Sequence, residues 1–476
     1  MNNSNFSSDT RNYLFNRMFP KLISIISVPI LLRLINPTFW GEVALLVGLQ
    51  ALVVGLISQG KTASMERYFT KMNRKFAKLY SLRYLYISIL LFFIIFIILE
   101  VGFRLTFFNF FDLPYGLPLR FALIGSLLIA HNRFLISILK SNQKSLKVLK
   151  YNQLLAISTP VAQVLSVYFI ITISDFQDRM IVSAYFFAQV LILLINNVSL
   201  LNFIRKNISF KNDITDEHLG KISTYSNYTY LFIIFSSLIN WADRYFIKIY
   251  SSQLDVGLYD AVYRIVDILG VIVGSFMVAI APILFSRREN TNNYFDNIRY
   301  QIEITFLLSL AGIFISPIAI ELILPSIYFS QIKIVPVLLL GLAFASSASV
   351  LTTIFDVNER KDLNLKGIAI GAILNIILNI IFIPKYGTLG AAYAMLLSSL
   401  FWFLANLYFS RSFNFKSKGI FINIVFVSMI TFIHFYLWEF SFIYNVFGII
   451  FFLYISYRSF KIFKKSSDCF YYHYRC

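Results

Sequence analysis

Residues 33–46, RLINPTFWGEVALL, and residues 248–262, KIYSSQLDVGLYDAV, share one organisation. In each stretch a long apolar segment ends in a short polar turn. A glycine, Gly41 or Gly257, then stands at the start of the next apolar segment. Glycine is common in any tight turn, so the likeness also has an ordinary explanation. The likeness indicates an internal repeat because the two stretches occupy equivalent positions among the apolar segments of the chain.

The composition of the chain indicates a membrane protein. Its 476 residues are 58% hydrophobic and only 14% charged, whereas soluble domains are about 45–50% apolar and about 25% charged. This composition excludes a disordered chain, a fibrous repeat and a typical soluble enzyme. The net charge is +19. In a chain this apolar we assign the surplus cations to cytoplasmic loops and to sites for anions, and expect no nucleic acid as a partner. The two cysteines, Cys469 and Cys476, provide no disulfide framework.

Fourteen segments are long and apolar enough to cross a bilayer, which requires about 20 residues. The polar residues 1–12 do not resemble a cleavable signal peptide, so we expect the first segment to remain. The loops are short and leave no room for a separate soluble domain. We therefore predict an all-α polytopic membrane protein with about 14 transmembrane helices: 13–35, 41–60, 81–101, 119–139, 150–173, 180–203, 222–248, 256–282, 300–323, 332–355, 364–383, 388–410, 418–438 and 441–462.

The distribution of Lys and Arg supports this segmentation. The loops after even-numbered segments and the two chain ends together hold 32 of the 42 Lys and Arg residues, and the loops after odd-numbered segments hold seven. A missed or invented helix would disturb this alternation in the rest of the chain. By the positive-inside rule we predict that both termini are cytoplasmic.

The repeated stretches divide the chain into two halves. They join segments 1 and 2 and segments 7 and 8, so the period is six helices. Because six is even, both halves have the same orientation, which is the parallel repeat of many transporters. We predict two pseudo-symmetric six-helix bundles, 1–204 and 222–410, a cytoplasmic linker, 205–221, and an extra helix pair with a tail, 411–476.

Three further motifs carry a family resemblance. Residues 240–247, NWADRYFI, followed by 257–264, GLYDAVYR, resemble the central signature of bacterial polysaccharide flippases. Residues 374–390, LNIILNIIFIPKYGTLG, resemble a pattern shared across the multidrug/oligosaccharidyl-lipid/polysaccharide (MOP) exporter superfamily. Residues 29–33, PILLR, with Gly41 beyond them, match a third family position. The resemblance covers essentially the whole chain and is closest to Wzx-type O-antigen flippases.

The resemblance implies a transporter and not an enzyme. Wzx-type proteins move undecaprenyl-diphosphate-linked O-antigen, or related repeat units, from the cytoplasmic to the periplasmic leaflet of the bacterial inner membrane by alternating access. A lipid-linked oligosaccharide is then the expected partner, together with membrane lipids, a polysaccharide polymerase and chain-length machinery. No cofactor is expected, and coupling to H⁺ or Na⁺ stays open.

Cations within or near the predicted spans are candidates for binding the diphosphate. An anion that crosses ~30 Å of hydrocarbon needs a wet cleft lined by positive charge. Arginine suits this role because its planar guanidinium binds phosphate through two hydrogen bonds. The alternative is that these long side chains reach the membrane interface along their alkyl stems, which is the favoured explanation for Lys21. In order of preference the candidates are Arg264, Arg244, Arg133, Arg17 and Lys21.

A second group of polar residues could form a network or couple it to transport. Asp243 and Arg244 are adjacent, about 100° apart on a helix, so we expect no pair between them. We expect Asp243 to bond Arg264 instead, and Asp267, on the same face as Arg264, to close the network. A direct substrate role for these charges remains an equal alternative. The amides of Asn240, Asn375 and Asn379 fit sugar hydroxyls, but they also suit ordinary packing between helices. We find no nucleotide loop or metal-ligand cluster in the sequence.

Three other functions compete with this prediction. A lipid-linked peptidoglycan precursor flippase shares the superfamily fold and is the hardest to distinguish. A cation-coupled small-molecule exporter usually has ionisable carboxylates inside its N-terminal half, whereas all acidic residues here between 11 and 200 fall in loops or at span ends. A membrane glycosyltransferase or polymerase tends to have a large outer loop, and the longest here runs only over about 101–118. Neighbouring sugar-nucleotide and glycosyltransferase genes would discriminate best.

Overall fold

The described part of the protein is helical throughout, as predicted. The computed structural model describes residues 19–20, 22–68, 74–105, 116–141, 145–173, 179–207, 218–267, 291–413, 415 and 428. Within these residues eight helices are long and apolar enough to cross a membrane. The prediction of an all-α polytopic membrane protein is therefore confirmed.

The described residues form α-helices and two short 3₁₀ helices. In chain order they are Leu22–Leu34, α2 (Pro37–Ser58), α3 (Lys61–Tyr68), α4 (Arg74–Arg104), α5 (Leu117–Ser141), α6 (Ser145–Ile173), α7 (Arg179–Asn207), α8 (His218–Tyr250), a helix whose described part is 253–267, α10 (Thr291–Ile323), η3 (Ser326–Ile334), α11 (Val335–Val357), α12 (Lys361–Ser410) and η4 (Arg411–Phe413).

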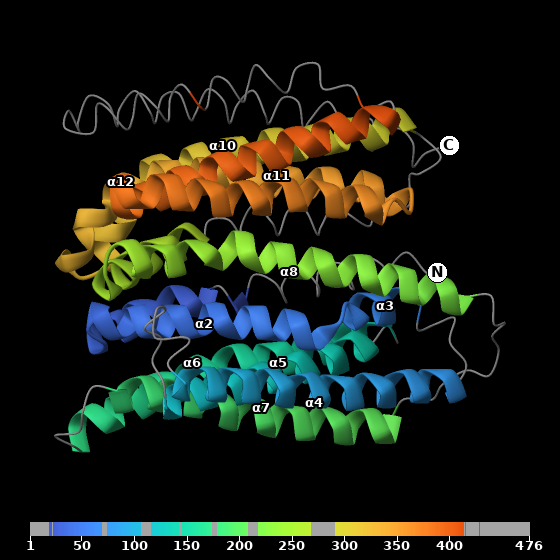
Figure 1. Ribbon diagram of the computed structural model, residues 1–476, viewed down its shortest axis with the longest axis horizontal. Helices are drawn as coiled ribbons and strands as arrows, with labels where there is room; N and C mark the ends of the chain where they lie inside the picture. Colours follow the sequence, from blue (N-terminus) through green and yellow to red (C-terminus); the bar gives the residue numbers. More distant parts are fainter. Residues whose placement is uncertain are drawn as a thin grey trace.

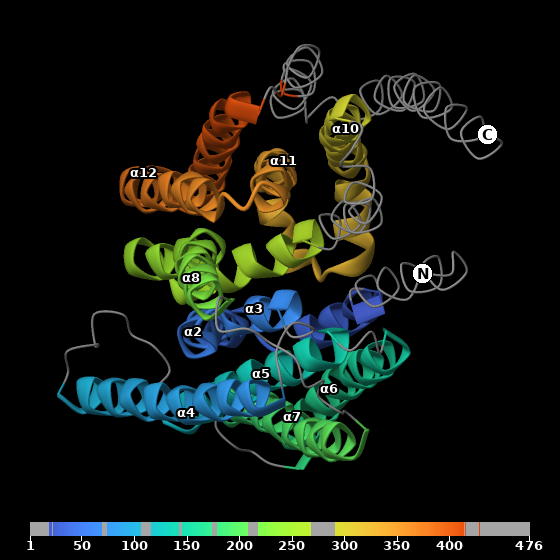
Figure 2. The ribbon, with the colours of Figure 1, turned by 90° about the vertical axis from the view of Figure 1, so that its right-hand side faces the viewer.

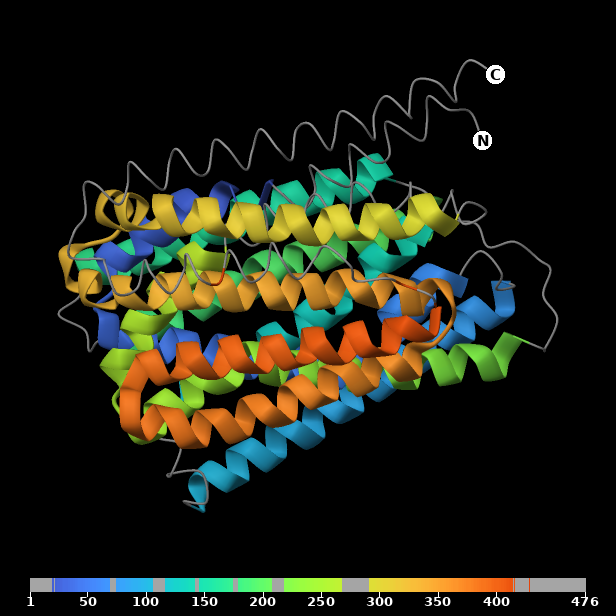
Figure 3. The same cartoon turned by 90° about the horizontal axis from the view of Figure 1, so that it is seen from above.

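Twelve of the fourteen predicted segments overlap these helices, although residues 268–282 of the segment 256–282 and residues 13–18 of the first segment lie outside the described residues. The segments 364–383 and 388–410 are the two arms of α12, which bends where Gly387 has φ 57° and ψ −132°. Figure 3 shows α12 turning back on itself at this point. Gly390 allows the bend to close, because a Cβ there would fall on the carbonyl oxygen of Phe382. The last two predicted segments, 418–438 and 441–462, lie outside the described residues.

The repeated stretches begin their second helices in the same way. Before α2, the side chain of Asn36 accepts a hydrogen bond of 3.1 Å from the Thr38 N–H, and Pro37 is the first helical residue. Before the helix 253–267, the hydroxyl of Ser252 accepts a hydrogen bond of 3.1 Å from the Asp255 N–H. Asn and Ser are preferred at this position because they satisfy an N–H group that has no partner within the helix.

The helices form two groups, which we call the first lobe (up to α7) and the second lobe (from α8 onward). Figure 1 and Figure 2 show α2 and α8 side by side where the lobes meet, with α4, α6 and α7 on the far side of the first lobe. In the most apolar window of α2, 72% of the residues are buried, against 11% in the windows of α4 and α6. The central helix α2 is thus enclosed by protein, whereas α4 and α6 present apolar side chains to the bilayer.

The hydrophobic core is continuous between the lobes. One cluster of buried side chains includes α2, α5 and α7 of the first lobe together with α8, α11 and α12 of the second. A second cluster fills the space within the second lobe between α8, α10, α11 and α12. We refer to the end of the bundle where α2 begins as the Gly41 end, and to the opposite end, where α3 lies, as the Arg67 end.

Candidate functional site

Two arginines and two aspartates meet between α8 and the helix 253–267. The Arg244 Nη1 atom donates to Asp243 Oδ1 at 2.8 Å, and its Nε and Nη2 atoms lie 3.2 Å from Asp260 Oδ1. The Arg264 Nε atom donates to the other oxygen of Asp260 at 2.7 Å. Asp260 therefore joins the two arginines, and we call these four residues the charged cluster.

The pairing differs from the sequence prediction in two respects. Asp243 and Arg244 do form a pair, because the long arginine side chain folds back along α8 and also donates to the carbonyl oxygen of Asn240 at 2.8 Å. The expected bond from Asp243 to Arg264 is absent from the described residues. The second oxygen of Asp243 instead accepts a hydrogen bond of 2.6 Å from the Tyr259 hydroxyl.

Asp260 is absent from the candidate residues named from the sequence. It precedes Arg264 by four residues, a spacing that places the two side chains on one helix face and was visible in the motif GLYDAVYR. Asp267, the expected partner, lies one turn beyond Arg264, and its side chain is half-buried. The carboxylate that orients Arg264 is therefore Asp260.

Arg244 is completely enclosed. Its side chain is 1% exposed, and its guanidinium carbon lies 4.8 Å from the ring centre of Trp241, 5.4 Å from that of Tyr259 and 4.1 Å from that of Tyr263. Two carboxylates and three aromatic rings surround the group, and cation–π contacts of this kind are strongest away from water. In this conformation Arg244 has no face left for a ligand.

Arg264 is more open than Arg244. Its side chain is 23% exposed, and its Nη2 atom has no hydrogen-bond partner. The guanidinium carbon lies 4.8 Å from the ring centre of Trp40, whose indole N–H is also unpaired. The buried hydroxyl of Tyr328, within the electrostatic influence of Asp260, is unpaired as well. Buried donors are normally satisfied, so Arg264 Nη2 and the nearby Trp40 indole N–H are donors whose hydrogen-bonding capacity is unused in this structure.

The asparagine candidates have different surroundings. Asn379 Nδ2 donates to Asn375 Oδ1 at 3.0 Å, and Asn375 Nδ2 donates to Ser398 Oγ at 3.2 Å. Both amides are buried between the two arms of α12, which favours the packing explanation for them. Asn240 is exposed on α8, and its amide donates to the carbonyl oxygen of Ser236 at 2.7 Å.

The remaining cations do not join the charged cluster within the described residues. Arg133 lies on α5 with an exposed side chain. Arg17 and Lys21 lie outside the described residues. The described residues also contain no group of three or more His, Cys, Asp or Glu side chains that could hold a metal ion.

The lobes are in contact at the Gly41 end. A Cβ atom at Gly41 would fall on the carbonyl oxygen of Gln253, and one at Gly257 would fall on the carbonyl oxygen of Pro37. The Gln253 amide also donates to Glu42 Oε1 at 2.9 Å and to the Thr38 carbonyl at 3.1 Å. The two stretches that are alike in sequence therefore pack directly against each other and close this end.

The lobes are also in contact at the Arg67 end. Arg67 Nη2 donates to Glu359 Oε1 at 2.8 Å, and its guanidinium carbon lies 5.1 Å from the ring centre of Tyr225. Nearby, the hydroxyls of Ser64 and Ser226 are 2.7 Å apart. The first residue of each pair is on α3 and the second is in the second lobe. Among the described residues, the lobes thus touch at both ends of the bundle, and a pocket of about 520 Å³ beside Arg67 and Glu359 remains at the Arg67 end.

A family model described as polysaccharide biosynthesis protein matches residues 13–288 of this chain. The chain belongs to this family. The matched region contains both repeated stretches and all four residues of the charged cluster. Among curated proteins, none matches the chain.

Solved structures identify the fold of this family member. The lipid II flippase MurJ, in an inward closed conformation, has a TM-score of 0.69 at 15% identity, over 96% of this chain and 99% of the MurJ chain. An inward-facing multidrug resistance MATE family transporter has a TM-score of 0.62 at 15% identity, over 86% and 96% of the chains. A MOP superfamily transporter from Pyrococcus furiosus has a TM-score of 0.62 at 15% identity, over 85% and 95%. At 15% identity these matches show the fold, and this fold agrees with the predicted resemblance to the MOP superfamily.

Proposed function

We propose that this protein is a flippase for undecaprenyl-diphosphate-linked oligosaccharides, namely O-antigen or related repeat units. The observation that carries the proposal is the environment of Arg264. Asp260 orients one edge of its guanidinium, while Nη2 and the indole N–H of Trp40 have no partner. A diphosphate supplies the oxygen acceptors that these donors lack, and the arginine stays charged at any working pH. Family membership supports the same assignment.

The mechanism that we propose is alternating access. We take the Arg67 end as cytoplasmic, following the positive-inside rule. Separation of Arg67 from Glu359 opens the bundle to the cytoplasm, and the diphosphate then reaches Arg264. The Arg67 end then closes. Gly41 and Gly257 separate, and the head group leaves on the periplasmic side.

Arg244 has a positioning role in this proposal. Because Asp260 accepts from both arginines, α8 and the helix 253–267 move together, and the orientation of Arg264 depends on Arg244. Asp243 holds Arg244 from the other side. Arg133, Arg17 and Lys21 are proposed as further cations along the path of the diphosphate, and Asn240 as a contact for sugar hydroxyls.

The remaining sequence predictions stay part of the proposal. The bundles are 1–204 and 222–410, joined by the linker 205–221, and the helix pair in 411–476 guides the lipid tail. The protein spans the bacterial inner membrane with both termini in the cytoplasm, and it hands its product to a polymerase and chain-length machinery. Coupling to H⁺ or Na⁺ is left open.

A second candidate function is the transport of a lipid-linked peptidoglycan precursor. It is favoured by the likeness to the lipid II flippase over 96% of the chain. Both candidates share the diphosphate and the polyprenyl tail and differ in the sugar. A cation-coupled exporter, suggested by the MATE structures, is less supported, because the carboxylates of the first-lobe spans, Glu42 of α2 and Glu100 of α4, lie near helix ends.

Reconstitution tests the proposal directly. Purified protein in vesicles should move a fluorescent undecaprenyl-diphosphate glycan to the leaflet where an impermeant quencher reaches it, and should leave a fluorescent phospholipid in place. Arg264→Lys keeps the charge but loses the planar fork, so it should reduce flipping only in part, whereas Arg264→Ala should abolish it. Full activity of a normally folded Arg264→Ala variant would exclude diphosphate binding by Arg264. Comparison of O-antigen and peptidoglycan head groups separates the two candidates.

A further inference from the structure

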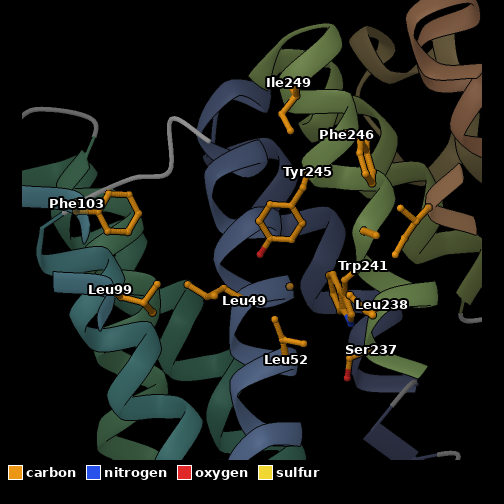
Figure 4. Close-up of a pocket in the computed structure, with 13 residues that line it drawn as sticks. Leu49, Leu52, Leu99, Phe103, Ser237, Leu238, Trp241, Tyr245, Phe246 and Ile249 are labelled. Carbon is orange, nitrogen blue, oxygen red and sulfur yellow. The ribbon is translucent and has the colours of Figure 1, made fainter. Parts of the chain in front are cut away.

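An apolar crevice of about 580 Å³ lies on the seam between the two lobes. Figure 4 shows Leu49 and Leu52 of α2 and Leu99 and Phe103 of α4 on one side, with a row of α8 side chains opposite. Ile376 of α12 completes the lining. The crevice is thus built from two helices of each lobe and continues the interface that α2 forms with α8.

The chemistry of the lining selects a hydrocarbon occupant. Its two side-chain hydroxyls are already satisfied, since Ser237 donates to the Ile233 carbonyl at 3.0 Å and Tyr245 donates to the Leu45 carbonyl at 2.8 Å. The other lining side chains are aliphatic or aromatic except for the glycine Gly48. Besides these hydroxyls, the indole N–H of Trp241 is the one further polar side-chain group among the lining residues, so the lining is almost entirely hydrocarbon.

The rims of the crevice face the bilayer. On α4, Val101 is 45% exposed, and on α12, Ile373 and Ile377 are 53% and 45% exposed. Exposed isoleucine and valine in a membrane protein contact lipid chains. A chain from the bilayer can therefore enter the crevice sideways without crossing a polar barrier.

Trp241 lies between the crevice and the charged cluster. Trp241 lines the crevice, and its ring centre lies 4.8 Å from the guanidinium carbon of Arg244. The seam is narrow here, because a Cβ at Gly48 would lie 3.2 Å from the Trp241 ring and 3.3 Å from the Tyr245 hydroxyl. Hydrocarbon on one side of this wall and buried cations on the other match a molecule with an apolar chain and an anionic head.

We propose that this crevice holds the part of the polyprenyl chain next to the diphosphate while the head group occupies the bundle. The proposal rests on the flippase function proposed above. It adds a site for the lipid tail between α2, α4, α8 and α12. Because the chain contacts both lobes, its binding depends on their relative orientation. Occupancy therefore favours the arrangement of lobes that forms the crevice.

Photocrosslinking of the full-length protein tests the site. Benzoylphenylalanine replaces Leu99 in the crevice or, as the matched control, Ile98 beside it on the bilayer face of α4. The probes are tritiated undecaprenyl diphosphate and tritiated phosphatidylglycerol, each in vesicles of phosphatidylethanolamine and phosphatidylglycerol. At position 99 we expect about tenfold more label from the polyprenyl probe, a preference of about 1.4 kcal/mol. At position 98 the two probes should label equally. Equal labelling at position 99 would overturn the proposal.

Filling the crevice provides a second, independent measurement. Leu52→Trp should lower both the flipping rate and the crosslink at position 99, with the amount of folded protein unchanged, whereas Ile98→Trp should change neither. If the wild type flips the glycan and Leu52→Trp flips it equally fast and keeps the crosslink, the tail site is wrong and the flippase function stands. If the wild type moves no polyprenyl-diphosphate glycan, the proposed function itself fails.

Discussion

Gly41 and Gly257 pack against each other with reciprocal contacts. The position of a Cβ on Gly41 is taken by the carbonyl of Gln253, four residues before Gly257, and that of a Cβ on Gly257 by the carbonyl of Pro37, four residues before Gly41. The first turn of each helix thus packs against the glycine of the other helix. Equivalent contacts in both directions are what a pseudo-two-fold axis between the two repeated stretches requires. Only glycine permits this approach of two backbones.

We expect Gly257→Ala to loosen the Gly41 end. The added methyl group meets backbone atoms that cannot rotate away, and overpacking of this kind costs about 1–3 kcal/mol. Val256 is fully buried, so a cysteine in its place reports loosening of this end through its rate of maleimide labelling. The native Cys469 and Cys476 are first replaced in this variant. Labelling should become faster. Gly55→Ala is the control, because its new methyl group would lie near side-chain atoms instead of backbone, 3.1 Å from Ile233 and 3.6 Å from Ser237.

Arg244→Ala should destabilise the protein more than Arg264→Ala. Loss of Arg244 leaves Asp243 and part of Asp260 unpaired in a fully buried place, and breaking a buried ion pair costs about 3–5 kcal/mol. Arg264 is 23% exposed and its loss leaves Asp260 paired with Arg244, so a smaller cost of about 1–3 kcal/mol is expected. Thermal unfolding in detergent measures both. Equal melting temperatures for the two variants would contradict the cluster geometry.

The Arg67–Glu359 pair should affect transport more than stability. The Glu359 side chain is 76% exposed, and exposed pairs contribute about 0–1 kcal/mol. Arg67→Glu places two negative charges at the contact between the lobes and should slow flipping with little change in melting temperature. The exchange Arg67→Glu with Glu359→Arg restores opposite charges and should recover the rate. A double variant as slow as the single one would show that the ion pair is not what closes this end.

Reporter fusions at Lys147 and Ser251 should report opposite sides of the membrane. Lys147 lies near the start of α6 at the Arg67 end, and Ser251 follows α8 at the Gly41 end. The positive-inside rule places Lys147 in the cytoplasm. Activity of a periplasmic reporter at Ser251 and of a cytoplasmic reporter at Lys147 is the expected result. The same side for both sites would invalidate the topology.

The sequence alone determined the helices and their order. Apolar length is a local property, so each of the twelve segments that can be compared overlaps a helix, although polar first turns extend α4 and α10 beyond the predicted starts at 81 and 300. The bend at Gly387 separates two segments that were already distinct. The glycine-containing turns identified the repeat for the same reason, because a helix start is encoded in a few neighbouring residues such as Asn36 and Pro37.

The tertiary structure decided how the charged residues pair. Asp243, Arg244 and Arg264 were identified from the rarity of charge in apolar segments, but their partners depend on the rotation and depth of two helices and on how far an arginine folds back. Asp260 bonds both arginines only because the packing of α8 against the helix 253–267 places Arg244 level with Asp260 along the helix axes. The crevice behind Trp241 likewise exists only once four helices from two lobes meet, since no stretch of sequence contains more than one of its walls.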